Sequence, residues 1–165
     1  MEDSLPQDEM QDLMREFIAE TEELLEGLDQ HFVRLEESPG DPALINEIFR
    51  AVHSIKGSAG FLGFNRLVEV AHQSENILNK IRQNEMQAAP ETIDIILESI
   101  DVLKTLLKEV KESSGELVDI NPIKRKLVLL LEFSSNTEAP PPPLQGTKED
   151  ENPSPQPSPL GGEGK

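Results

Sequence analysis

Four residues of one predicted helix could carry chemistry: His53, Lys56, Gly57 and Gly60. Their spacings of three and four positions place them on one strip of that helix. A neutral imidazole is a nucleophile, a lysine stabilises negative charge on a group in transfer, and two glycines leave open space beside the ring. The strip therefore predicts a histidine that receives a phosphoryl group from the active site of another protein.

A second pair of residues follows on the next predicted helix. Gly63 is a plausible end of the first helix, and residues equidistant from a tight turn there lie side by side. His72 and Glu75 then reach the level of His53. We expect Glu75 to accept a hydrogen bond from Nδ1 of His53, which leaves Nε2 free to attack, and His72 to donate to this network or tune its charge.

Each of these residues also has a simpler interpretation when taken alone. A single helical histidine is more often a surface or capping residue, and His31 is assigned to that class. A glycine inside a helix costs roughly 1 kcal/mol relative to alanine, so Gly57 and Gly60 need a reason. That reason is either clearance for a docking partner or close packing between helices. The combination with His72 and Glu75 favours the transfer site, and the glycines are assigned to partner docking.

The apolar residues recur every three to four positions through four long segments, which predicts four amphipathic helices. Asp41 is suited to cap the second helix, with Pro42 in its first turn, and Asn65 to cap the third. A short fifth helix is expected after Asn121, although the run 127–131 also fits a buried strand. The expected helices span residues 8–37, 42–63, 66–88, 90–112 and about 122–131. We predict an all-α fold, an antiparallel up-and-down four-helix bundle with an additional C-terminal helix.

The composition limits the domain count and the classes of partner. The 165 residues allow one domain at 1–134, followed by a proline-rich linker or tail at 135–165 with few core-forming residues. A formal charge of -17 opposes binding to nucleic acid and to anionic membranes. The chain has no cysteine, no signal segment at its start and no apolar stretch of about 18 residues. We expect a cytoplasmic, monomeric domain.

The run HSIKGSAGFLGF at 53–64 resembles the phosphorylation-site helix of histidine phosphotransfer (HPt) domains, most of all the N-terminal phosphotransfer domains of CheA-type chemotaxis kinases. The segment AHQSE at 71–75 is similar to the family's alanine-histidine-x-x-glutamate segment on the next helix. The resemblance covers about residues 8–133. It implies that His53 is the phosphorylated residue and that Lys56, His72 and Glu75 form its hydrogen-bonding network.

The resemblance also implies a role in a chemotaxis-type two-component phosphorelay. His53 would accept a phosphoryl group from the ATP-binding domain of a CheA-type kinase and pass it to an aspartate in the receiver domain of a response regulator. The partners would supply ATP and Mg²⁺, because the chain has no Gly-rich nucleotide loop. The kinase's other domains do not fit in 165 residues. The chain therefore resembles either the phosphotransfer part of such a kinase or a free-standing HPt protein, and we expect no use of ATP by the chain alone.

Two functions from other classes remain open on the residues themselves. His53, His72 and Glu75 could ligate a metal in a helical bundle, although bundle iron sites use more carboxylates than this. The long first helix could instead dock a partner in a passive interaction bundle, with His53 incidental.

Overall fold

The computed structural model describes residues 5–113 and 117–136, which form helices connected by short loops and contain no strand. The helices are α1 (Gln7–Glu37), α2 (Pro42–Leu62), α3 (Asn65–Arg82), α4 (Pro90–Glu112) and α5 (Asn121–Asn136). The segment 127–131 is thus helical, and the all-α prediction is confirmed. The compact unit that contains the helices ends at Ser134. The predicted proline-rich tail lies outside the described residues from 137 onward.

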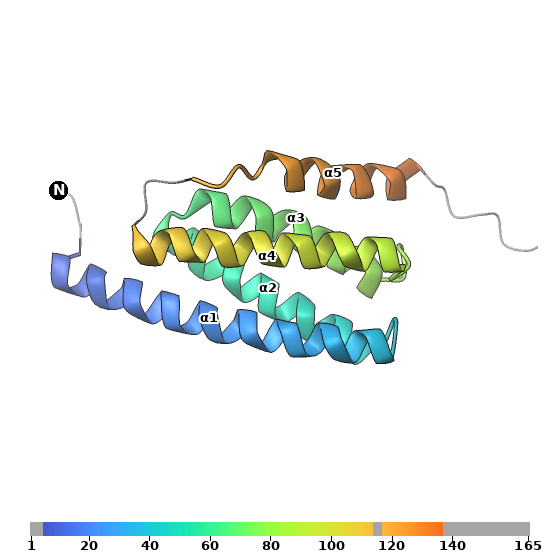
Figure 1. The fold of residues 1–165 in the computed structure, drawn as a ribbon, viewed down its shortest axis with the longest axis horizontal. Coiled ribbons are helices and arrows are strands. Elements are labelled where there is room, and N and C mark those ends of the chain that lie inside the picture. The colour runs from blue at the N-terminus through green and yellow to red at the C-terminus, as the bar shows by residue number, and fades with distance from the viewer. Residues whose placement is uncertain (1–4, 114–116, 137–165) are drawn as a thin grey trace, which may run out of the picture. The chain divides into compact units, whose positions relative to one another are not determined.

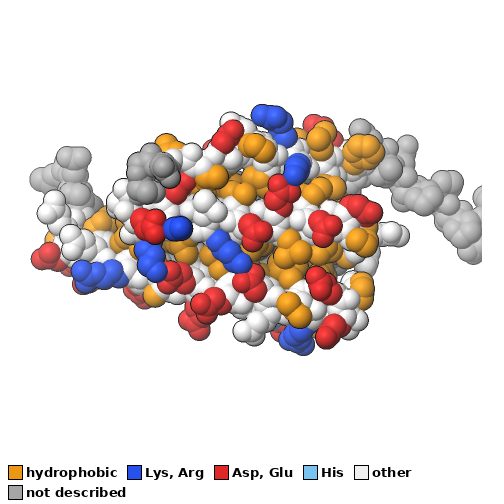
Figure 2. Space-filling view, viewed as in Figure 1, with side chains coloured by type: hydrophobic (Ala, Val, Ile, Leu, Met, Phe, Trp, Pro, Cys, Tyr) orange, Lys and Arg blue, Asp and Glu red, His pale blue; other side chains and the backbone are white. Residues whose placement is uncertain are grey.

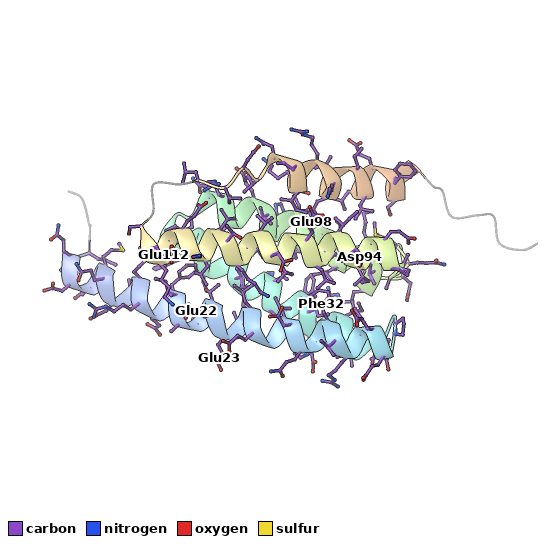
Figure 3. The ribbon with its side chains drawn as sticks, viewed as in Figure 1. Glu22, Glu23, Phe32, Asp94, Glu98 and Glu112 are labelled. Atoms are coloured by element: carbon purple, nitrogen blue, oxygen red, sulfur yellow. The ribbon has the colours of Figure 1, made fainter. Side chains whose placement is uncertain are left out.

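Helices α1 to α4 form a closed bundle (Figure 1). Contacts join α1 to α2, α2 to α3, α3 to α4, and α4 back to α1. Successive helices run in opposite directions because their connections are short. Two ion pairs join the fifth helix to the bundle, from Lys124 to Glu69 of α3 and from Lys126 to Glu98 of α4. Figure 3 labels Glu98 on α4. The predicted up-and-down bundle with an added C-terminal helix is confirmed.

All five helices contribute side chains to one hydrophobic core. Burial of a large aliphatic side chain stabilises the fold by about 1.5–3 kcal/mol, so the apolar stripes seen in the sequence dominate its stability. Fully buried representatives, one from each helix in order, are Leu28, Ile55, Leu78, Leu103 and Leu127.

A buried polar contact lies between α3 and α4. The hydroxyl of Ser74 donates to Oγ of Ser99 at 2.8 Å, and the hydroxyl of Ser99 donates to the backbone carbonyl of Ile96 in its own helix. The Val70 carbonyl lies 2.9 Å from Oγ of Ser74. Buried hydroxyls are costly unless they are paired, so this contact favours one alignment of the two helices. Ser74 directly precedes Glu75, and the alignment therefore also fixes the height of Glu75 in the bundle.

The ends of α2 are those that the sequence indicates. Oδ1 of Asp41 accepts a hydrogen bond from the backbone N–H of Ala43 at 2.9 Å, and Pro42 occupies the first turn. Gly63 has a left-handed backbone with φ of 80°, and the following N–H of Phe64 bonds to Ala59 O. The chain thus turns sharply into α3, which brings α3 alongside the histidine helix.

The predicted bounds of α3 were wrong at both ends. The helix begins at Asn65 itself, after Phe64, and no side chain caps it. It ends at Arg82 rather than near residue 88, because Asn84 adopts a left-handed backbone with φ of 61°. Met86 and Ala88 still pack against the core from the loop, which explains why the apolar pattern runs past the helix.

Acidic side chains are spread over the face of α1 and α4, with basic side chains between them (Figure 2). Ion pairs join the two helices there, from Lys104 to Asp29 and from Lys111 to Glu22. Such exposed pairs contribute little stability individually, so the core remains the main source. Among the described helices, none is long and apolar enough to cross a membrane.

Candidate functional site

The site lies between α2 and α3, which run side by side on either side of the turn at Gly63. Nδ1 of His53 is 3.2 Å from Oε2 of Glu75. The histidine side chain is 59% exposed, whereas that of Glu75 is only 13% exposed. Within the described part of the chain, Nε2 of His53 has no hydrogen-bond partner. The ring therefore presents one nitrogen to a carboxylate and leaves the other available to solvent.

Lys56 binds to the same carboxylate. Its Nζ lies 2.9 Å from Oε2 and 3.1 Å from Oε1 of Glu75. The sequence predicted Lys56 as a cation near the histidine, and the family resemblance implied that Lys56 and Glu75 share a hydrogen-bonding network with His53, but neither specified a direct ion pair between the two. Glu75 thus joins the nucleophile and the cation, and the lysine head group is held close to the site.

The charge state of Glu75 follows from its surroundings. Burial acts to raise its pKa, but hydrogen bonds and charge interactions from Lys56 and His53 outweigh burial and leave the pKa below its ordinary value. Glu75 is therefore ionised at neutral pH. An ionised carboxylate can only accept, so Nδ1 of a neutral His53 carries the proton and Nε2 carries the free lone pair.

His72 does not join the other three residues by a contact. It lies on the exposed side of α3, one turn before Glu75, and the described residues give it no hydrogen bond or ion pair. The structure thus brings together His53, Lys56 and Glu75. A role for His72 in the network stays a prediction.

The two glycines of the histidine strip are exposed on α2. A Cβ at Gly57 would meet no atom within 4 Å, and one at Gly60 would meet only Cγ2 of Val68 at 3.8 Å, an ordinary contact. Close packing between helices therefore does not require either glycine, which removes the alternative explanation weighed from the sequence. Their assignment to partner docking stays a prediction that this open strip supports.

A groove runs beside the same strip between α1 and α2. Its volume is about 400 Å³, and its lining includes Gly57, Phe17 of α1 and Phe61 of α2. The Phe61 side chain is 75% exposed. An exposed aromatic beside a groove near the histidine is typical of a surface that another protein covers.

Two residues near His53 were missed by sequence reasoning. The ring of Phe49 stacks on that of His53, with centroids 5.9 Å apart and planes inclined by 13°. Cζ of Arg82, the last residue of α3, lies 4.0 Å from the Phe49 ring centroid. An aromatic residue four positions before a histidine was a readable signal for the first contact. Nothing in the sequence pointed to the second.

The metal-binding alternative gains no support from the geometry. Among the described residues, no three or more His, Asp or Glu side chains are grouped so that they could hold a metal ion. The described residues give His72 no hydrogen bond or ion pair with His53 or Glu75.

Comparison with known proteins decides the family. The Hpt domain family matches residues 12–113. The chain belongs to this family. This chain is 37% identical to the CheA phosphotransferase domain from Thermotoga maritima. The two structures match with a TM-score of 0.58, over 61% of this chain and 95% of that one. The predicted resemblance to CheA phosphotransfer domains is confirmed.

Two further similarities extend the comparison. The Hpt domain is 41% identical over 109 residues to the sensor histidine kinase CheAY of Helicobacter pylori, covering 66% of this chain but only 14% of that protein. The phosphorylated P1 domain of CheA3 in complex with CheY6 from R. sphaeroides shares the fold, with a TM-score of 0.66 and 20% identity over 77% of this chain and 98% of that one. The chain therefore spans a small part of the curated kinase that it matches.

Proposed function

We propose that this Hpt domain carries a phosphoryl group on Nε2 of His53. It would receive the group from the ATP-binding domain of a CheA-type kinase and pass it to an aspartate of a response regulator, in the cytoplasm, as part of a chemotaxis-type two-component system. The observation that carries the proposal is the pair of His53 and Glu75: Nδ1 faces an ionised carboxylate at 3.2 Å while Nε2 of an exposed ring is free.

The transfer step follows from this geometry. The Nε2 lone pair attacks the γ-phosphorus of ATP, a P–N bond forms, and the bond to the β,γ-bridging oxygen breaks with its electron pair leaving on ADP. The ring gains positive charge, which is shared with the Nδ1–H group beside Glu75. In the onward step a carboxylate oxygen of the response regulator attacks the phosphorus, and the P–N electron pair returns to Nε2.

Lys56 is placed to stabilise the transferred group. An ammonium has three N–H donors, and the two oxygens of Glu75 occupy two of them at most. A remaining donor lies one helical turn from the histidine and can reach a phosphoryl oxygen. We propose that the partners supply ATP and Mg²⁺, because this chain's own residues provide the nucleophile, its orienting carboxylate and one cation.

The two partners would have to reach the ring in turn. The open strip of Gly57 and Gly60 and the neighbouring groove allow a concave active site to approach His53. A domain of the same fold, the P1 domain of CheA3, has been solved phosphorylated and in complex with CheY6. These observations support a carrier that docks on a response regulator.

The test is a phosphorylation assay in two stages. The chain is incubated with the ATP-binding and dimerisation domains of a CheA-type kinase, Mg²⁺ and ATP radiolabelled in the γ-phosphate, and then a receiver domain is added. We expect label on the wild-type chain that mild acid removes and base does not, followed by its loss to the receiver. Label that persists in His53→Gln, or that resists acid and yields to base, would overturn the proposal.

A matched control comes from the histidine of α1. His31 also faces a carboxylate, with Nδ1 3.3 Å from Glu47. His31→Gln should be labelled and should transfer like the wild type, because His31 lies outside the site. Without kinase, none of the variants should acquire label.

A further inference from the structure

Three side chains form a row on the surface of α2. Asn46, Phe49 and His53 follow one another at successive turns of the helix. Arg82 of α3 lies beside the Asn46 end of this row. Its Nη1 donates to Oδ1 of Asn46 at 3.3 Å, and its Nη2 donates to Oδ1 of Asn79, also in α3, at 2.9 Å. The order along the helix is therefore the arginine beside Asn46, then the Phe49 ring, then the imidazole.

The exposed ring of His53 needs more than one contact to be held in one orientation. The hydrogen bond to Glu75 fixes the direction of Nδ1 but leaves the ring plane free to tilt about that bond. The Phe49 ring supplies a second constraint, because its plane lies within 13° of the imidazole plane. Among the described residues, these are the two side chains that contact the imidazole through a hydrogen bond or a ring stack.

Arg82 in turn holds Phe49. Its guanidinium carbon lies 4.0 Å from the phenyl centroid, within the range of a cation–π contact, and the two asparagines fix the guanidinium in place. Phe49 is only partly exposed and packs against the hydrophobic core. The phenyl ring is thus confined on its core side and capped by the arginine, so it offers the imidazole a fixed face.

We propose that Phe49, held by Arg82, is a positioning residue that sets the plane of the His53 imidazole for attack at phosphorus. The Nε2 lone pair lies in the ring plane, so a tilt of the ring moves it out of line with the phosphorus. This inference rests on the proposed phosphotransfer function, but part of its test does not depend on phosphorylation.

The first measurement is NMR of the unphosphorylated full chain, without kinase. In the wild type the stacked phenyl ring should shift the ring protons of His53 upfield, and the two imidazole ¹⁵N signals should report protonation at Nδ1. Phe49→Leu keeps an apolar side chain but removes the aromatic face, so we expect the upfield shift to be lost. The two nitrogen signals should still report protonation at Nδ1, because Glu75 is unchanged. Phe49→Tyr restores an aromatic face and should restore the upfield shift.

The second measurement is the initial rate of phosphorylation by the kinase domains. We expect Phe49→Leu to lower kcat about tenfold while the KM for the Hpt domain changes little, because the partner surface is intact and only the ring orientation is lost. Phe49→Tyr should stay within about twofold of the wild type. Arg82→Gln should give part of the loss in both measurements, and Arg82→Lys, which keeps a cation, should give less.

A core substitution separates positioning from general destabilisation. Ile96→Val lies in α4 with a fully buried side chain and leaves Phe49, Arg82 and His53 in place. It should lower the melting temperature while the wild-type rate and His53 signals are retained. If Ile96→Val slows phosphorylation as much as Phe49→Leu does at a similar loss of melting temperature, the proposal is overturned.

The outcomes distinguish this inference from the function on which it rests. A wild-type chain that never acquires label overturns phosphotransfer, while the NMR comparison still shows whether the stack orients the ring. A wild-type chain that is labelled, with Phe49→Leu showing wild-type rates and His53 signals, overturns the positioning role alone. Equal losses in Phe49→Leu and Phe49→Tyr would also overturn it, because the aromatic face would then not be the cause.

Discussion

Lys56 and His53 share one carboxylate oxygen: Oε2 of Glu75 lies 2.9 Å from Nζ of the lysine and 3.2 Å from Nδ1 of the histidine. The anion therefore orients the nucleophile and anchors the cation at the same time. Because these two partners hold its pKa below the ordinary value, Glu75 is charged at neutral pH. A change at any one of the three residues should alter the other two.

Substitution of the shared carboxylate is the most direct consequence. Glu75→Gln can still accept from Nδ1, but it no longer balances the positive charge that attack develops on the ring. We expect the initial rate of His53 phosphorylation to fall about tenfold or more, since charged hydrogen bonds exceed neutral ones by about 1 kcal/mol or more. The measurement is the labelling rate at saturating kinase and ATP.

The matched control is Glu47→Gln, which removes the carboxylate beside His31. That variant should be labelled at the wild-type rate. A Glu75→Gln protein with an unchanged rate would show that the carboxylate does not orient the nucleophile.

The pH dependence of stability provides a second check on Glu75. A carboxyl group whose pKa is lowered on folding stabilises the native state above its unfolded pKa, and this contribution is lost as pH falls through the folded pKa. The difference in unfolding free energy between wild type and Glu75→Gln should therefore be present above about pH 4.5 and shrink as the pH falls below that value. Urea unfolding at a series of pH values measures it. If the difference instead grew as the pH fell below about 4.5, folding would disfavour the charged form of Glu75, and the prediction would be wrong.

The domain boundary can be tested by truncation. The compact unit ends at Ser134, and α5 ends at Asn136. A chain that stops after residue 136 should keep the melting temperature of the full chain and accept label from kinase added in trans at the same rate. Circular dichroism and the labelling assay measure the two properties. A large loss of melting temperature would place residues beyond 136 in the folded domain.

Much of the site was predictable because it depends on helix geometry. The turn at Gly63 fixes which residues of α2 and α3 share a level, and this is sufficient to pair His53 with Glu75. The caps at Asp41 and Gly63 follow from local backbone chemistry and needed no tertiary information.

The parts that sequence reasoning missed depend on side-chain direction across helices. Arg82 reaches Phe49 because the two asparagines orient its guanidinium, and no spacing rule describes such a contact. The early end of α3 depends on the left-handed Asn84, a conformation that asparagine adopts more readily than most residues but not by rule.

Alanine substitutions at Gly57 and Gly60 should affect the stability of the fold and the transfer reaction in opposite directions. Both lie inside α2, where alanine is favoured by about 0.5–1 kcal/mol, and an added Cβ meets open space at Gly57 and only an ordinary contact at Gly60. Gly57→Ala and Gly60→Ala should therefore each raise the unfolding free energy by about that amount. If the strip provides clearance for the partners' active sites, the same methyl groups should raise the KM of the Hpt domain for the kinase, and we expect about tenfold for Gly57→Ala, the nearer to His53.

Gly27 in α1 offers the matched control, since it is also helical and a Cβ there would meet no atom within 4 Å. Gly27→Ala should give a similar gain in urea unfolding with an unchanged KM. If Gly57→Ala raises the stability of the fold but weakens transfer, while Gly27→Ala raises stability alone, then Gly57 is kept as glycine for the sake of a partner. The fold by itself would be more stable with alanine at either position. If transfer by Gly57→Ala and Gly60→Ala instead matched the wild type, the open strip would have no part in docking, and access to His53 would depend on the neighbouring groove of α1 and α2.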